Sequence, residues 1–190
     1  RDLVRSRGLG DVYKRQRVIH ALGTGQGYEI NDDLICEGGN YSSGSVGALV
    51  DMVSLPPNNP YQAHILGLDS IGSAVYCAPG LAPVVQTLPS AGEIQGGATR
   101  AAYESNTLYV LNPDANSIYV YVTTNGQFLD LPIDYFESAE PGEKPDISSV
   151  TDLEVSGAKL YLLQSNGLIV ECVQRFGRRP CQLPEPRTLY

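Results

Sequence analysis

Short apolar runs bounded by turn-forming residues recur along this chain, and helical periodicity is hard to find in it. Such a pattern predicts an all-β fold. Three pairs of runs predict hairpins of one design, at 64–69 with 74–77, 107–111 with 117–122, and 159–163 with 168–173. In the third hairpin, Asn166 and Gly167 provide the positive φ angles that a tight turn needs.

Each predicted hairpin follows another short strand, at 47–55, 98–105 and 149–157. Aligned hairpins place Ile65, Leu108 and Leu160 at equivalent positions, separated by 43 and 52 residues. Repeats of this length, made of several short strands, are typical of a β-propeller. We therefore expect an incomplete propeller of about three and a half blades of four-stranded antiparallel sheet, a β-sandwich with Greek-key connections being the alternative. The expected parts are a blade remnant at 17–44 and blades at about 45–95, 96–148 and 149–190.

The first sixteen residues, RDLVRSRGLGDVYKRQ, do not share this pattern. Back-translation of Asp11–Gln16 matches the mosaic end of a transposase-made sequencing library, and the preceding residues fit the adapter before it. We interpret 1–16 as adapter-derived and exclude it from fold reasoning, the alternative being a basic N-terminal arm. The chain is accordingly expected to be an internal fragment.

Charge and cysteine usage change once this stretch is set aside. The full chain has a net charge of −8, and residues 17–190 keep eight basic and 19 acidic side chains, a net charge of −11. Phosphate backbones and anionic lipids would repel such a domain, which disfavours nucleic-acid binding. Cys172 and Cys181 bracket a span short enough for a bridge between neighbouring strands, and Cys36 with Cys77 would follow by elimination. Two disulfides would indicate an oxidising compartment, whereas buried free thiols are the alternative.

The sequence contains no recognisable catalytic, metal or cofactor site. His20 and His64 are the only histidines and lie on separate predicted strands, without a nucleophile elbow or metal-ligand spacing. One polar set stands out by position: Asp51, Arg100 and Asp152 occupy equivalent places in the first strand of successive repeats. In a propeller that strand lines the central channel, so these side chains are candidates for ligand binding. Alternatively, they pair with one another or cap loops.

Several segments together resemble a known family. GSVGALVDM, HILGLDSIGSAVYCAPG and NTLYVLNPDANSIYVY are similar to a propeller of bacterial membrane proteins with an N-terminal protein-phosphatase-like domain, and the resemblance covers nearly all of 17–175. It implies a cytoplasmic phosphatase-like domain, a transmembrane helix, and this propeller outside the membrane as a sensor or interaction module. The family provides no established catalytic residues, and the cysteine set departs from its pattern.

The expected function is therefore non-catalytic. The propeller would bind a protein or small-molecule ligand, with no cofactor, and would contact a membrane only through an upstream anchor. The alternatives are a propeller-type enzyme, such as a lactonase or lyase with its site at the channel mouth, and a structural spacer.

Overall fold

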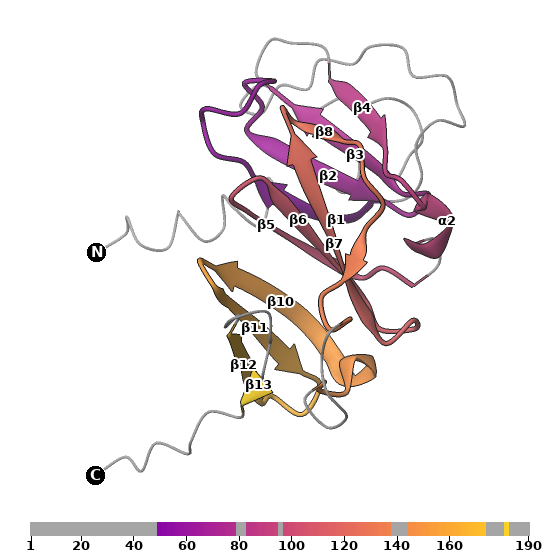
Figure 1. Ribbon diagram of the computed structural model, residues 1–190, viewed down its shortest axis with the longest axis vertical. Coiled ribbons are helices and arrows are strands. Elements are labelled where there is room, and N and C mark those ends of the chain that lie inside the picture. Colours follow the sequence, from indigo (N-terminus) through magenta and orange to yellow (C-terminus); the bar gives the residue numbers. More distant parts are fainter. Residues whose placement is uncertain (1–48, 79–82, 95–96, 138–143, 174–180, 183–190) are drawn as a thin grey trace, which may run out of the picture. The chain divides into compact units, whose positions relative to one another are not determined.

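The computed structural model describes residues 49–78, 83–94, 97–137, 144–173 and 181–182 (Figure 1). The fold is all-β, as the sequence predicted, with three antiparallel sheets and two short helical segments, α2 (Ala91–Ile94) and η1 (Ile147–Ser149), in the described part. The chain divides into two compact units, residues 1–91 and 92–190, which are described separately. The stretch 1–16 and the expected blade remnant 17–44 lie outside the described residues.

The first sheet lies in the first unit and has the order β1-β2-β3-β4. Its strands are β1 (Leu49–Ser54), β2 (Ile65–Asp69), β3 (Ser73–Cys77) and β4 (Val84–Thr87). The side chains of β3 are buried along its whole length. A central strand with both faces covered favours the apolar sequence that β3 has.

The second sheet begins the second unit and is a meander extended at one edge. Its strands are β5 (Arg100–Glu104), β6 (Thr107–Asn112), β7 (Ser117–Thr124), β8 (Gln127–Phe128) and β9 (Ile133–Asp134). The expectation of four strands is corrected here, because two short strands, β8 and β9, both pair with β7. Pro132 lies between them and has no N–H to donate, which is consistent with the interruption of a single edge strand.

The third sheet has the order β10-β11-β12-β13. Its strands are β10 (Val150–Ser156), β11 (Lys159–Gln164), β12 (Ile169–Val173) and β13 (Cys181–Gln182). The turn between β11 and β12 contains Gly167 at φ +84°, where the absence of a Cβ removes the usual steric cost.

The second and third sheets share one hydrophobic core. The second sheet contributes side chains from β5, β6 and β7, and the third contributes side chains from β10, β11 and β12. The buried residues of the core are Ala102, Leu111, Ile118, Val120, Tyr135, Phe136, Ile147, Val150, Leu153, Val155, Leu160, Leu162, Val170 and Cys172. The two sheets therefore pack together within the second unit, with β5 and β10 as neighbours.

Buried polar side chains hold the turns of the first two hairpins. Asp69 follows Leu68 at the end of β2, and its carboxylate accepts hydrogen bonds from the backbone N–H groups of Ser73 (2.6 Å) and Ile71 (3.1 Å). Asn112 follows Leu111 at the end of β6, and its Oδ1 accepts from Ala115 N–H at 3.0 Å. Both side chains are buried. The corresponding residue after Leu163, Gln164, is partly exposed.

Candidate functional site

The three polar residues singled out by the sequence share one register position. Asp51 lies opposite Leu68, Arg100 opposite Leu111, and Asp152 opposite Leu163. The three leucines are separated by 43 and 52 residues, the same spacings that relate the three hairpins. Each polar residue therefore occupies the same place in its own sheet, on the first strand.

Asp51 and Asp152 also have the same local backbone geometry. The register shifts between Leu49 and Asp51 in β1, and between Val150 and Asp152 in β10, so each aspartate follows a bulge. In each, Oδ1 accepts a hydrogen bond from the N–H of the next residue, at 2.8 Å from Met52 and 3.0 Å from Leu153. The pairing of Arg100 in β5 is continuous, so the arginine position lacks this bulge.

Arg100 and Asp152 are brought together because β5 and β10 are neighbours in the second unit. Arg100 Nε lies 3.8 Å from Asp152 Oδ1, and the two side chains are 47% and 58% exposed. Arg100 Nη1 also donates to the carbonyl of Thr99 at 2.7 Å. An exposed ion pair of this kind contributes about 0–1 kcal/mol, because water screens it and both side chains lose entropy. Two of the three candidates therefore pair with each other, while both keep surface available to a ligand. Asp51 lies in the other unit and is described only there.

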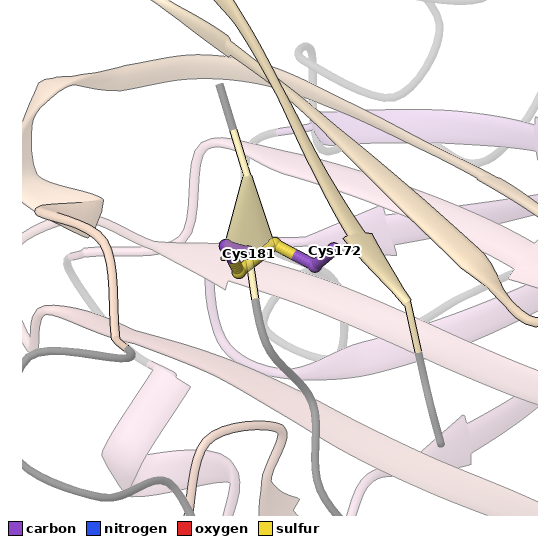
Figure 2. The surroundings of a disulfide bond; sticks show 2 residues. All are labelled: Cys172 and Cys181. Atoms are coloured by element: carbon purple, nitrogen blue, oxygen red, sulfur yellow. A yellow bond between two sulfur atoms is a disulfide. The ribbon is translucent and has the colours of Figure 1, made fainter. Parts of the chain in front are cut away.

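The structure joins Cys172 on β12 to Cys181 on β13 by a disulfide (Figure 2). The two residues lie directly opposite each other in the register of these strands, which is the bridge between neighbouring strands that their spacing predicted. Cys77 is also disulfide-bonded, whereas Cys36 lies outside the described residues.

Two of the disulfide-bonded cysteines, Cys77 and Cys172, occupy an equivalent position on the third strand that the sequence alone did not reveal. Cys77 pairs in register with Ile65, Tyr121 with Leu108, and Cys172 with Leu160. Those three partners are the residues that align the hairpins. In the second sheet, Tyr121 makes an edge-to-face contact with Phe128 of β8, with ring centroids 6.1 Å apart. One position on the third strand thus secures the outer strand by an aromatic contact in one sheet and by a disulfide in another.

Two further observations concern the described part of the chain. Among its residues, no group of three or more His, Cys, Asp or Glu is placed to hold a metal ion. Neither does it contain a helix of the length and hydropathy that crossing a membrane requires.

Comparisons with known proteins were made for both sequence and structure. No family model matches the sequence, and no curated protein matches it. Among solved structures, the chain is similar to one described as PorZ, an essential bacterial surface component of the type-IX secretion system of Porphyromonas gingivalis. The sequence identity is 16%, the TM-score is 0.36, and the match covers 76% of this chain and 22% of the PorZ chain. The chain thus spans less than a quarter of that structure's length, and a similarity of this size identifies neither fold nor function.

Proposed function

We propose that this chain is part of a β-propeller that acts as a non-catalytic binding module outside the cytoplasm, within a larger membrane-anchored protein with a phosphatase-like domain. The observation that carries the proposal is that three similar sheets have a charged residue, Asp51, Arg100 or Asp152, at one register position. We call Arg100 and Asp152, which the second unit brings together, the polar row.

The order of the strands supports a propeller. In each described sheet, the first four strands pair with their neighbours in the sequence, as the strands of a propeller blade do, and β9 of the second sheet adds a further pairing with β7. The first strands of the second and third sheets, β5 and β10, are also neighbours. First strands that adjoin in this way are expected where blades surround a central channel.

The charges of the row support the binding of a polar ligand. Arg100 and Asp152 are about half exposed, so a ligand could contact both signs of charge without the cost of desolvating a buried pair. Their mutual contact is long, at 3.8 Å, and a ligand group could replace it with shorter charge-assisted hydrogen bonds. A molecule that combines cationic and anionic groups would suit such a row.

The disulfides support a location outside the cytoplasm. Cys172 and Cys181 are joined, and Cys77 is also bridged. Disulfides persist in oxidising compartments and are rare in the cytoplasm, where cellular reductants keep thiols reduced.

A thermal-shift experiment tests the binding role. The purified chain is heated with L-arginine, L-glutamate, citrate or spermidine, each as a separate probe. A compound present at a hundredfold excess over its Kd should stabilise the protein by about 2.7 kcal/mol. Arg100→Glu should abolish the stabilisation. Lys159→Glu is the matched control, because both cations are 47% exposed and both have an acidic neighbour.

Either of two results would overturn the binding role. The first is a compound that stabilises the wild type and Arg100→Glu equally, since binding would then not involve the row. The second is no stabilisation by any of the four compounds at millimolar concentration, which would favour the structural spacer.

A reporter fusion tests the location separately. Alkaline phosphatase, which is active only outside the cytoplasm, is fused after residue 190 in the gene carried from its natural start codon. We expect active phosphatase from intact cells. A second fusion at the same point uses a reporter enzyme that is active only in the cytoplasm. Activity of this second fusion, with none from alkaline phosphatase, would contradict the proposed location.

A further inference from the structure

One face of the third sheet has a row of apolar side chains that remains exposed in the described structure. Leu163 of β11 lies opposite Ile169 of β12, and the two are 38% and 49% exposed. Their neighbours Leu162 and Val170 point to the other face and are 0% and 4% exposed, because that face lies in the core shared with the second sheet. We call the exposed side the distal face. Its residues are Asp152, Glu154, Ser156, Lys159, Tyr161, Leu163, Ile169, Glu171 and Val173.

The second sheet has the same apolar pair at the same place. Leu111 lies opposite both Arg100 and Ile118, just as Leu163 lies opposite both Asp152 and Ile169. The residue types are also identical, a leucine on the second strand and an isoleucine on the third. Yet Leu111 and Ile118 are each 0% exposed, because the third sheet contributes to the core around them.

The limits of the covered area also correspond between the two sheets. In the second sheet, coverage decreases toward the pair Thr107 and Val122, where Val122 is 54% exposed. The equivalent end of the third sheet is Lys159 with Val173. There Lys159 Nζ forms an ion pair with Glu171 Oε1 at 2.9 Å. The ion pair on the distal face therefore lies at the end that corresponds to the exposed end of the second sheet. The apolar pair Leu163 and Ile169 lies where the second sheet is covered. Two residues depart from this correspondence, since Glu171 takes the place of the buried Val120 and Glu154 that of the buried Ala102.

We propose that the distal face is an interface that packs against a further four-stranded antiparallel sheet, contributed by a continuing repeat of the same polypeptide. That sheet would place the aliphatic side chains of its second and third strands over Leu163 and Ile169. It would do so in the way that Leu160, Leu162 and Val170 contribute to the core around Leu111 and Ile118. This inference rests on the repeat architecture of the proposed function.

The charges of the distal face favour a following sheet over a second copy of this chain. Asp152, Glu154 and Glu171 lie on this face with one lysine, Lys159, and the only other cation that pairs with them in the described residues is Arg100 of the second sheet, 3.8 Å from Asp152. Two copies packed by the same face would bring like charges together in a setting of reduced solvation, which is unfavourable. A following sheet can instead present a cation on its first strand, which continues the alternation of Arg100 and Asp152.

Thiol labelling tests this interface. Leu163→Cys and Ile169→Cys each place a reactive thiol on the distal face, in a chain whose native cysteines are all disulfide-bonded where the structure describes them. Leu168→Cys is the matched control. Leu168 is 49% exposed, like Ile169, but lies in the turn outside the strands. Maleimide labelling is followed in the 190-residue chain and in the natural gene product carried through to its own stop codon.

In the 190-residue chain, all three thiols should react at similar rates. In the natural gene product, the thiols at 163 and 169 should react more slowly by about tenfold or more, because labelling would require the interface to open, while the thiol at 168 keeps its rate. Circular dichroism checks that each variant is folded, and agreement between the two distal positions guards against a local effect of one substitution.

Two results would overturn the proposal. The first is equal labelling of all three thiols in the natural gene product. The second is protection in the 190-residue chain alone that rises with protein concentration and accompanies a doubled mass in light scattering, which would assign the face to a second copy. Neither result depends on the effect of Arg100→Glu on ligand binding, so this interface and the proposed binding role can fail separately.

Discussion

The second and third sheets have the same order of their first four strands and the same register in their central hairpins, but their surroundings differ. Leu111 and Ile118 of the second sheet are fully buried, whereas Leu163 and Ile169 of the third are exposed at the equivalent positions. On its opposite face, the second sheet is buried as well, with Leu108 and Val110 each 0% exposed. Identical residue types in one backbone setting thus contribute differently to stability, because burial depends on what covers the face.

The outer strands provide a second contrast between these sheets. Tyr121 contacts Phe128 of β8, and the equivalent Cys172 is bonded covalently to Cys181 of β13. A two-residue strand has few backbone hydrogen bonds to hold it in place, so in both sheets a side-chain contact adds to the ladder. The third sheet, with one exposed face, is the one that has the covalent link.

The largest expected effect comes from truncating the equivalent leucines. Leu111→Ala should reduce the free energy of unfolding by about 2–5 kcal/mol, because it leaves a cavity in the shared core. Leu163→Ala should cost about 1 kcal/mol or less, because its side chain already contacts water. Urea unfolding followed by circular dichroism measures both. Equal losses would contradict the contrast in burial between the two sheets.

Removal of the bridge in the third sheet should have the next largest effect. The double substitution Cys172→Ser with Cys181→Ser should reduce the free energy of unfolding by about 2–3 kcal/mol, because the bridge closes a short loop in the unfolded chain. The sequence separation of the two cysteines is 9. Urea unfolding without reductant makes the measurement while leaving the bridge at Cys77 in place. Unchanged stability of the double variant would show that the bridge does not hold β13.

The last residue of the second strand distinguishes the sheets in a third way. We call it a cap where its buried side chain accepts a hydrogen bond from the turn, as Asp69 and Asn112 do. Asn112→Ala should cost about 0.5–1.5 kcal/mol, because the exposed turn residue Ala115 loses the hydrogen bond from its N–H to the buried side chain of Asn112. Asn112→Asp should restore much of the loss, since Asp69 fills the equivalent place in the first sheet. The partly exposed Gln164 should tolerate alanine within about 0.5 kcal/mol. Thermal unfolding of the three variants compares them, and an equal loss for Asn112→Ala and Gln164→Ala would contradict a special role for the cap.

The smallest effect concerns the charged end of the distal face. The hydrogen bond and charge of Glu171 raise the pKa of Lys159 above its ordinary value of 10.5. A raised folded-state pKa contributes stability that is fully present below 10.5 and lost as the pH rises through the folded-state value. Wild type should therefore lose slightly more stability than Glu171→Gln between neutral pH and pH above 10.5. Urea unfolding across that range tests the difference, and parallel pH profiles would show that this exposed pair contributes nothing.

Much of the local structure could be predicted from the sequence. The three hairpins and the three preceding strands lie where alternating apolar runs and turn residues placed them. Gly167 has the positive φ angle predicted for its turn, whereas the same prediction for Asn166 was wrong, because the loop from β11 to β12 reaches its left-handed conformation at the glycine alone. The spacing of Cys172 and Cys181 anticipated their bridge, and the spacing of Asp51, Arg100 and Asp152 anticipated their equal register. These features depend on interactions between residues near in sequence, or on the repetition of one such unit.

The shortest strands were the least predictable elements. β8, β9 and β13 have two residues each, too short to show an alternating pattern. The buried caps Asp69 and Asn112 were also missed, since a polar residue at a turn has the same sequence signature whether its side chain is buried or exposed. The repetition of Leu-Asp and Leu-Asn at the ends of the second strands was the available signal.

The sequence by itself determined the all-β class, the hairpins and the shared register position of Asp51, Arg100 and Asp152, because each follows from local propensity and spacing. Only the tertiary structure decided which face of each sheet is covered, that two short strands share the edge of β7, and that Arg100 meets Asp152. The physical reason is that an apolar strand has two faces of similar character, and its sequence does not say what lies against either. Contacts between neighbouring sheets join residues about fifty positions apart, and folding alone brings them together.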